Sequence, residues 1–112
     1  MCLFCKIVNK EIAADIVYEN DEVMAFKDIN PKALVHVLIV PKVHIKNVGE
    51  ITKDNAKILG AIHLAANEIA KKMGIFEDGY RLITNCGEGA GQTVWHLHYH
   101  LLGGEGLKEE II

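Results

Sequence analysis

Three histidines, His96, His98 and His100, occupy alternating positions near the carboxyl end of this 112-residue chain. In an extended strand every second side chain points to the same face, so the spacing predicts a row of three imidazoles. The positions that alternate with them are apolar and predict a face packed on the core: Trp95, Leu97, Tyr99 and Leu101. Neutral imidazole can serve as a nucleophile, a general base or a metal ligand. We therefore expect the row to face open space and to do chemistry.

A glycine-rich loop, residues 86–93, comes directly before the histidines. Its glycines allow backbone N–H groups to approach an anion closely, and Gln92 and Thr93 add side-chain donors. A hairpin connection also needs glycine, so the loop alone does not distinguish a turn from an anion site. Because it leads into the histidine row, donors and a nucleophile would converge on one anion such as a phosphate.

The three cysteines, Cys2, Cys5 and Cys86, are an odd number in a chain without a secretory signal pattern. This favours metal binding or reduced thiols over a disulfide framework. A Cys-x-x-Cys pair such as Cys2 and Cys5 can hold one zinc, and a structural zinc needs four ligands, so histidines brought close by the fold would supply the other two. The alternative is a pair of buried reduced thiols, and we expect Cys86 to be a packed thiol.

The composition predicts a single globular domain, residues 1–112. Half of the residues are apolar, enough for a core, but no apolar run approaches the roughly 18 residues that a membrane span needs. We therefore expect a cytoplasmic protein without a membrane partner. The 12 basic and 15 acidic residues give a formal charge of -3 without a basic block. This argues against a nucleic-acid polymer as partner and leaves a small anionic ligand open.

Short apolar segments predict the elements that position these groups. Phe4 and Ile7 are three residues apart and favour a short helix over residues 3–9. Five strands are expected, of which the first two form a hairpin and the third ends at Pro41: 16–18, 23–26, 35–40, 80–85 and 96–102.

A long helix is predicted from Thr52, as the N-cap, to Lys72, with Gly74 ending it. His63 lies off its apolar stripe and is expected at the surface. The elements predict an α+β domain in which a mainly antiparallel five-stranded sheet carries this helix and the short N-terminal one. The long helix would cover one sheet face and leave the other, with the histidine row, in solvent. The stripe consists of Leu59, Ile62, Ala66, Ile69 and Met73.

Three segments resemble the histidine triad (HIT) family. Residues 91–104, GQTVWHLHYHLLGG, are similar to its signature, His-x-His-x-His followed by two apolar residues. Residues 26–31 and 36–45 resemble the nucleotide-pocket region of the purine nucleoside phosphoramidase-like branch, and the resemblance extends from Leu3 to Gly104. It implies a HIT-like fold and a homodimer.

The resemblance implies a nucleotidyl hydrolase that cleaves the α-phosphate bond of purine nucleoside phosphoramidates or related conjugates and releases AMP or GMP. His98 would attack phosphorus to form a nucleotidyl-histidine intermediate, which water then resolves. His36 and His100 would bind phosphate oxygens or assist proton transfer. The remaining residues that it implies bind the phosphate and leaving group (Asn85, Gly91, Gln92 and the catalytic Thr93), the ribose (Asp28) and the base (Phe4, Ile7, Phe26, Ile29 and Leu38).

Many bacterial members that begin with this Cys-x-x-Cys pair bind zinc, and the resemblance implies the ligands Cys2, Cys5, His44 and His96. In this interpretation His96 binds metal while His98 does the chemistry. Crowded imidazoles disfavour one another's protonation, which we expect to keep His98 neutral near pH 7. Two other functions stay open: a hydrolase whose zinc activates water, and a protein that binds a purine nucleotide without catalysis.

Overall fold

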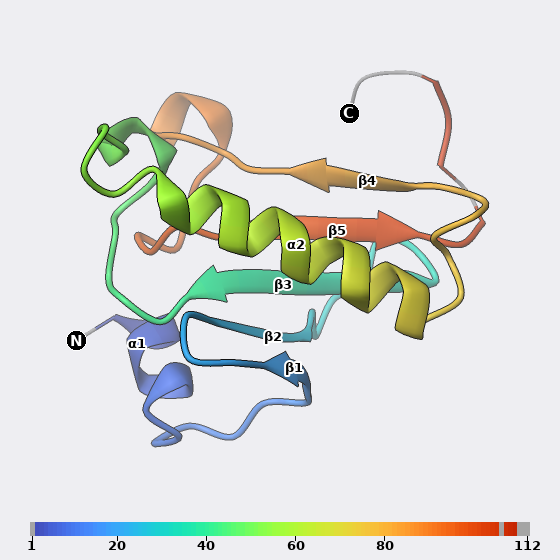
Figure 1. Ribbon diagram of the computed structural model, residues 1–112, viewed down its shortest axis with the longest axis horizontal. Coiled ribbons are helices and arrows are strands. Elements are labelled where there is room, and N and C mark those ends of the chain that lie inside the picture. Colours follow the sequence, from blue (N-terminus) through green and yellow to red (C-terminus); the bar gives the residue numbers. More distant parts are fainter. Residues whose placement is uncertain (1, 106, 110–112) are drawn as a thin grey trace.

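The computed structural model describes residues 2–105 and 107–109, which form an α+β domain. One five-stranded sheet has the order β1-β2-β3-β5-β4, and all neighbouring strands are antiparallel (Figure 1). The expected fold class is therefore confirmed, and no helix among the described residues is long and apolar enough to cross a membrane. The strands are β1 Ile16–Glu19, β2 Val23–Lys27, β3 Val35–Pro41, β4 Tyr80–Ile83 and β5 Tyr99–Gly103. The helices are α1 Leu3–Val8 and α2 Lys57–Lys72, with 3-10 turns η1 Val48–Glu50 and η2 Glu88–Ala90.

The helix α2 covers one face of the sheet and forms the larger hydrophobic core with it (Figure 1). Leu97, Tyr99 and Leu101 point into this core, which confirms that they face away from the histidines. Trp95 does not follow them: it is 38% exposed, and the Lys46 ammonium lies 5.2 Å from the centre of its ring. The prediction that Trp95 packs on the core is wrong.

The opposite face of the sheet is partly covered and does not lie open to solvent. Leu38 and Val40 of β3 point to this side, while Val37 and Ile39 point toward α2, so β3 is buried on both faces. This explains the apolar run over residues 37–40 of β3, which is typical of a strand covered on both sides. The expectation of a wet second face is wrong here, because α1 provides a second cover. The cluster beneath α1 consists of Phe4, Ile7, Met24, Phe26, Leu38 and Val40.

The long helix begins later than the sequence predicts. It starts at Lys57, and its N-cap position, Ala56, makes no side-chain capping bond. Thr52 instead caps a preceding turn, because its hydroxyl oxygen accepts from the Asp54 N–H at 3.2 Å. The carboxyl end agrees with the prediction, since Gly74 follows with a φ of 76°. His63 is exposed, as expected. Cys86 is also exposed, so the expectation of a packed thiol is wrong.

Two strands are shorter than predicted. The strand predicted at 80–85 is β4, which ends at Ile83, and the histidine strand predicted at 96–102 is β5. β5 begins at Tyr99, so His96 and His98 lie in the segment before it. The register of β3 and β5 would place Leu97 opposite Pro41, and proline has no N–H for the ladder. The Leu97 N–H instead donates to the Ile45 carbonyl oxygen at 2.6 Å.

Candidate active site and metal centre

His98 is held so that one ring nitrogen remains available. Its Nδ1 lies 2.7 Å from the carbonyl oxygen of His96, and because a carbonyl only accepts, this nitrogen carries the proton. The neutral ring therefore has its lone pair on Nε2. The rings of Phe4 and His100 flank it at centroid distances of 5.1 and 5.3 Å. With 9% of His98 exposed, the arrangement presents a nucleophilic nitrogen on a fixed ring.

His36 and His100 form a hydrogen-bonded pair whose direction is set by the backbone. The Lys32 N–H donates to His36 Nδ1 at 3.0 Å, which places the His36 proton on Nε2. This Nε2–H donates to His100 Nδ1 at 2.9 Å, so His100 carries its own proton on Nε2. His100 therefore offers an N–H next to the ring of His98. One imidazole can attack an electrophile while its neighbour donates to an oxygen bound to that electrophile.

Burial keeps the paired histidines neutral near pH 7. It lowers the pKa of His100 to about 4, and nearby His98 and His36 act in the same direction. Burial also lowers the pKa of His36, although the carboxylate of Asp28 opposes this. Asp28 Oδ2 lies 3.4 Å from His36 Nε2, so the carboxylate shares the donor that His36 offers to His100.

A polar cavity of about 650 Å³ lies beside this pair. Among its lining residues are His36, His100, Asn85 and Gly91, all of which the sequence assigns to phosphate binding. Asp28 also lines it. The structure therefore brings together residues from the ends of β2 and β4, the strands β3 and β5, and the glycine loop.

A second cavity, of about 480 Å³, lies among apolar side chains. Asp28 lines this cavity as well. Phe4 of the apolar cavity and His100 of the polar one flank the ring of His98, which itself lines neither of these two cavities. Among the residues assigned to the base, Ile29 is 92% exposed and forms only the rim of the cavity, whereas the remaining members of that set are buried. The apolar lining includes all five residues that the sequence assigns to the base: Phe4, Ile7, Phe26, Ile29 and Leu38.

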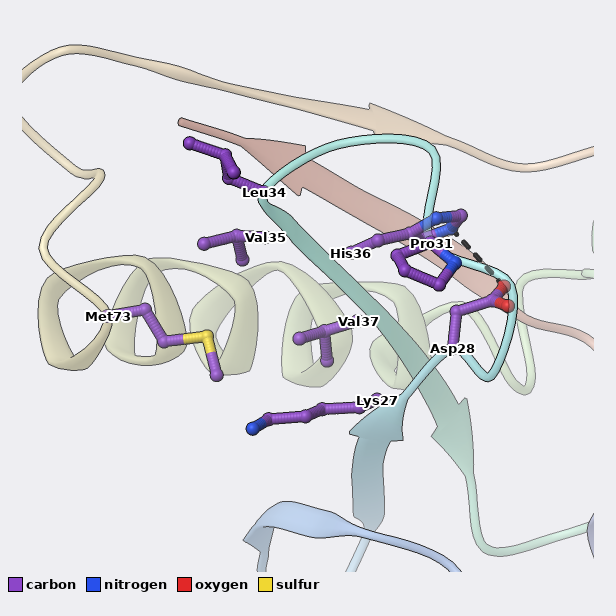
Figure 2. Close-up of a pocket in the computed structure, with 8 residues that line it drawn as sticks. All are labelled: Lys27, Asp28, Pro31, Leu34, Val35, His36, Val37 and Met73. Atoms are coloured by element: carbon purple, nitrogen blue, oxygen red, sulfur yellow. Dashed lines mark ion pairs between the residues drawn. The ribbon is translucent and has the colours of Figure 1, made fainter. Parts of the chain in front are cut away.

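A third cavity, of about 380 Å³, opens on the α2 side of the same region. Figure 2 shows Val35, Val37 and Met73 along it, with the Asp28–His36 ion pair at one end. Val35 and Val37 point toward the core beneath α2. The other charged residue that lines this cavity, Lys27, forms an ion pair with Asp15 at 3.6 Å, so the cavity shares only Asp28 and His36 with the histidine site.

The glycine loop has the backbone conformation that its glycines allow. Gly87 and Gly91 have φ angles of 93° and 85°, in the left-handed region that favours glycine. Thr93 is exposed, whereas Gln92 is buried and its amide makes four hydrogen bonds within the protein. The expectation that the Gln92 side chain donates to a phosphate is wrong, because both of its N–H groups are already used.

Four residues from three parts of the chain meet in a compact cluster: Cys2, Cys5, His44 and His96. The six distances among the two Sγ and two Nδ1 atoms range from 3.2 to 3.6 Å. Four points with such spacing are the corners of a tetrahedron whose centre lies about 2.1 Å from each, close to zinc–nitrogen and zinc–sulfur bond lengths. The sequence-derived ligand set is therefore assembled as a metal site requires.

The surroundings of the cluster also suit a structural zinc. The His96 Nε2–H donates to the Pro41 carbonyl oxygen at 2.8 Å, which leaves the Nδ1 lone pair directed at the cluster. Four protein ligands leave no open position for a reacting water, which is typical of structural zinc. Burial and the neighbouring Cys2 raise the pKa of the Cys5 thiol, so metal binding would release a proton.

Asp28, His36 and His100 form a second group with metal-ligand atoms, within 4.8 Å of one another. A metal there would need the lone pair of His36 Nε2, but the hydrogen bond from Lys32 to Nδ1 places a proton on that nitrogen. We therefore interpret this group as a hydrogen-bonded relay and not as a metal site.

Backbone groups that orient the histidines were not predicted from the sequence. They are the Lys32 N–H and the carbonyl oxygens of His96 and Pro41. Every residue has such groups, so no residue type marks them. Asn47, which bonds Gln92, is a buried polar residue that the sequence pattern also did not single out.

Comparisons with known proteins agree with this fold. The family described as "Scavenger mRNA decapping enzyme C-term binding" matches residues 1–110. A purine nucleoside phosphoramidase from Escherichia coli K12 is 47% identical over 105 residues, which cover 94% of this chain and 88% of that protein.

Two solved structures share nearly the whole fold. A HIT family hydrolase from Clostridium thermocellum has a TM-score of 0.96 and 60% identity, covering 99% of this chain and 96% of its own. A histidine triad protein from Clostridium difficile has a TM-score of 0.94 and 46% identity, covering 98% of this chain and 96% of its own. The chain belongs to the histidine triad family.

Proposed function

We propose that this protein is a nucleotidyl hydrolase that cleaves purine nucleoside phosphoramidates and related conjugates at the α-phosphate. The observation that carries the proposal is the His98 ring. Its Nδ1–H is bonded to a backbone carbonyl, its Nε2 is left with a lone pair, and its neighbours Phe4 and His100 line the two cavities. The related E. coli protein, named a purine nucleoside phosphoramidase, supports the reaction class.

The two cavities suit the two ends of a nucleotide. The apolar one would hold the purine between side chains such as Phe4 and Leu38, because an aromatic base gains from burial against apolar and aromatic groups. Asp28 lines both cavities and would accept hydrogen bonds from the ribose hydroxyls at their junction. The α-phosphate would then lie in the polar cavity, within reach of His98 and His100.

The reaction would proceed in two displacements at phosphorus. In the first, a bond forms between His98 Nε2 and phosphorus while the bond to the leaving amine breaks, and the amine takes a proton from solvent in the polar cavity as it departs. The histidine then carries positive charge, and its Nδ1–H bond to the His96 carbonyl stabilises it. In the second, water attacks phosphorus, the bond to Nε2 breaks, and the proton released by water replaces the one that was used.

His100 and Thr93 would assist these steps. The Nε2–H of His100 would bond a phosphate oxygen as negative charge develops there, and His36 fixes that tautomer. Thr93 is exposed beside the loop, and we assign its hydroxyl to the leaving group. General acid–base assistance of this kind commonly contributes about 10²–10⁴-fold in rate.

We assign a structural zinc to Cys2, Cys5, His44 and His96. When bound, the metal supplies cross-linking and takes no part in phosphorus chemistry. The helix α1 has only six residues, too few for a stable isolated helix, yet it contributes Phe4 to both the apolar cavity and the side of His98. A fixed α1 therefore keeps the base site formed.

We also propose a cytoplasmic homodimer whose ligand is a small purine nucleotide and not a nucleic acid or a membrane. The outer edges of β1 and β4 end the sheet among the described residues, and exposed sheet edges favour pairing between subunits. Light scattering of the purified protein tests the dimer, which a monomer mass across the micromolar range would contradict.

The enzymatic proposal is tested by turnover of an adenosine phosphoramidate by the purified protein. We expect AMP release by the natural sequence and none above background by His98→Ala. A nucleotide-binding protein without catalysis would bind AMP but release none from the conjugate. A zinc hydrolase would retain activity in His98→Ala and lose it when the metal is removed.

A further inference from the structure

Gln92 uses every hydrogen-bonding position of its side-chain amide inside the protein. Its Nε2 donates to the carbonyl oxygens of Lys46 at 2.8 Å and Val94 at 3.0 Å. Its Oε1 accepts from Asn47 Nδ2 at 3.1 Å and from the Gly87 N–H at 2.9 Å. Only 4% of the residue is exposed, so solvent does not replace these bonds unless the structure opens.

Only an amide in this orientation satisfies the four partners. Two are carbonyl oxygens that need donors, and two are N–H groups that need an acceptor. A glutamate has the same shape, but its carboxylate brings no donor and sets negative charge against two carbonyl oxygens. An alanine would leave all four partners without a bond. The four protein partners alone therefore explain why this position requires glutamine.

This amide joins the glycine turn, residues 87–91, to a distant segment of the chain. Gly91 of the turn lines the polar cavity, and a Cβ added at Gly87 or Gly91 would meet no atom within 4 Å, so this side of the turn is open. On the other side, Lys46 and Asn47 closely follow His44 of the metal cluster. The turn is thereby attached to a segment that the metal cluster also holds.

We propose that Gln92 is a positioning residue that preforms the phosphate end of the site by clamping the glycine turn to Lys46 and Asn47. It would touch no substrate itself. The inference rests on the proposed function, in which the α-phosphate of the nucleotide binds beside the glycine turn. A turn that is ordered before the ligand arrives saves ordering entropy on binding. Loss of the clamp should weaken recognition of phosphate and spare recognition of the nucleoside in the apolar cavity.

The test compares the binding of AMP and adenosine to the full-length, zinc-loaded protein by calorimetry. For Gln92→Glu and Gln92→Ala we expect the Kd of AMP to rise about tenfold or more, because small misplacements of binding groups are costly. The Kd of adenosine should change less than about twofold, and kcat should fall more than KM rises. A matched control is Asn67→Ala, which removes the bond that the Asn67 side-chain oxygen accepts from the Tyr80 hydroxyl, on the face of the sheet that α2 covers.

Equal weakening of AMP and adenosine, or unchanged AMP affinity in a folded variant, would overturn the inference. If the Gln92 variants do not fold, Asn47→Ala removes one of the four bonds together with the bond that Asn47 accepts from the Gly49 N–H. It is judged by the same comparison of the Kd of AMP with the Kd of adenosine. Amide hydrogen exchange of the natural protein is an independent test, because the clamp should protect the Gly87 N–H from exchange. Exchange of this N–H at the rate of an unprotected loop amide would contradict the clamp. If the natural protein binds no AMP, the proposed function fails, and the inference fails with it.

Discussion

The carbonyl oxygen of His96 accepts a 2.7 Å hydrogen bond from Nδ1 of His98, while the ring of His96 belongs to the metal cluster. One residue thus links the metal centre to the proposed nucleophile. Its side chain is fully buried, and its backbone carbonyl sets the tautomer of His98. The orientation of His98 therefore depends on a member of the proposed metal cluster.

Replacement of His98 should abolish the reaction without unfolding the protein. We expect His98→Ala to reduce kcat by about 10⁴-fold or more, as when a nucleophile is removed from an enzyme that forms a covalent intermediate. Release of AMP from an adenosine phosphoramidate measures this. His63→Ala is the matched control, because His63 is exposed on α2, and it should retain nearly full activity. Equal losses in both variants would contradict the assignment.

The free energy of unfolding should decrease as the pH is lowered, because of His100. Its folded pKa of about 4 lies below the ordinary 6.5, so between these values the unfolded chain binds a proton that the folded protein does not. The contribution of His100 is thus fully present above about pH 6.5 and is lost as the pH falls through about 4. Denaturant unfolding from pH 7.5 to 4.5 should show a smaller decrease for His100→Asn than for the natural protein. Identical decreases would refute the assignment.

Zinc removal should loosen the N-terminal helix before it affects the chemistry. A ligand at 1,000 times its Kd stabilises a fold by about 4 kcal/mol, so a chelator should lower the midpoint of thermal unfolding markedly. Activity should decline as nucleotide affinity declines, and the residual activity should still require His98. Cobalt in place of zinc should give the absorption bands of a tetrahedral site with two thiolates.

Two outcomes would contradict a structural zinc. Metal release without any change in thermal stability would show that the cluster does not hold α1. Complete loss of activity with unchanged AMP affinity and unchanged stability would favour the zinc-activated water.

Asp28 should recognise the ribose. We expect Asp28→Asn to lower kcat/KM for a ribonucleoside conjugate about tenfold or more, since hydrogen bonds to a charged group are worth about 1.5–3 kcal/mol. The contact of Asp28 with His36 affects every substrate alike, so the informative quantity is the ratio between this conjugate and its 2′,3′-dideoxy analogue. The ratio should fall toward one in the variant. An unchanged ratio would place the ribose elsewhere.

The sequence predicts the elements of this fold better than their ends. The alternation of Leu97, Tyr99 and Leu101 predicts a buried face, which the structure confirms, whereas the sequence did not predict the second cover over β3. The ends depend on contacts that no local pattern contains. Thr52 caps a turn instead of the helix, and Pro41 ends the ladder that would have included Leu97.

The candidate site is predicted by residue type but not by hydrogen-bond direction. The Cys-x-x-Cys pair and the family resemblance identify the four members of the metal cluster, which the fold assembles. The role of Gln92 was misread, because its four partners come from separate segments and are mostly backbone groups. The direction of the His36–His100 bond likewise follows from one backbone N–H that has no residue signature.

The most direct test of the mechanism is detection of the covalent intermediate. The protein is mixed with an adenosine phosphoramidate, quenched within one turnover in base, where phosphorus–nitrogen bonds to histidine survive, and digested for mass spectrometry. We expect one AMP group attached to the ring of His98 and none in the His98→Ala variant. An adduct on His36 or His100, or AMP release at full rate with no adduct at any time point, would contradict nucleophilic attack by His98.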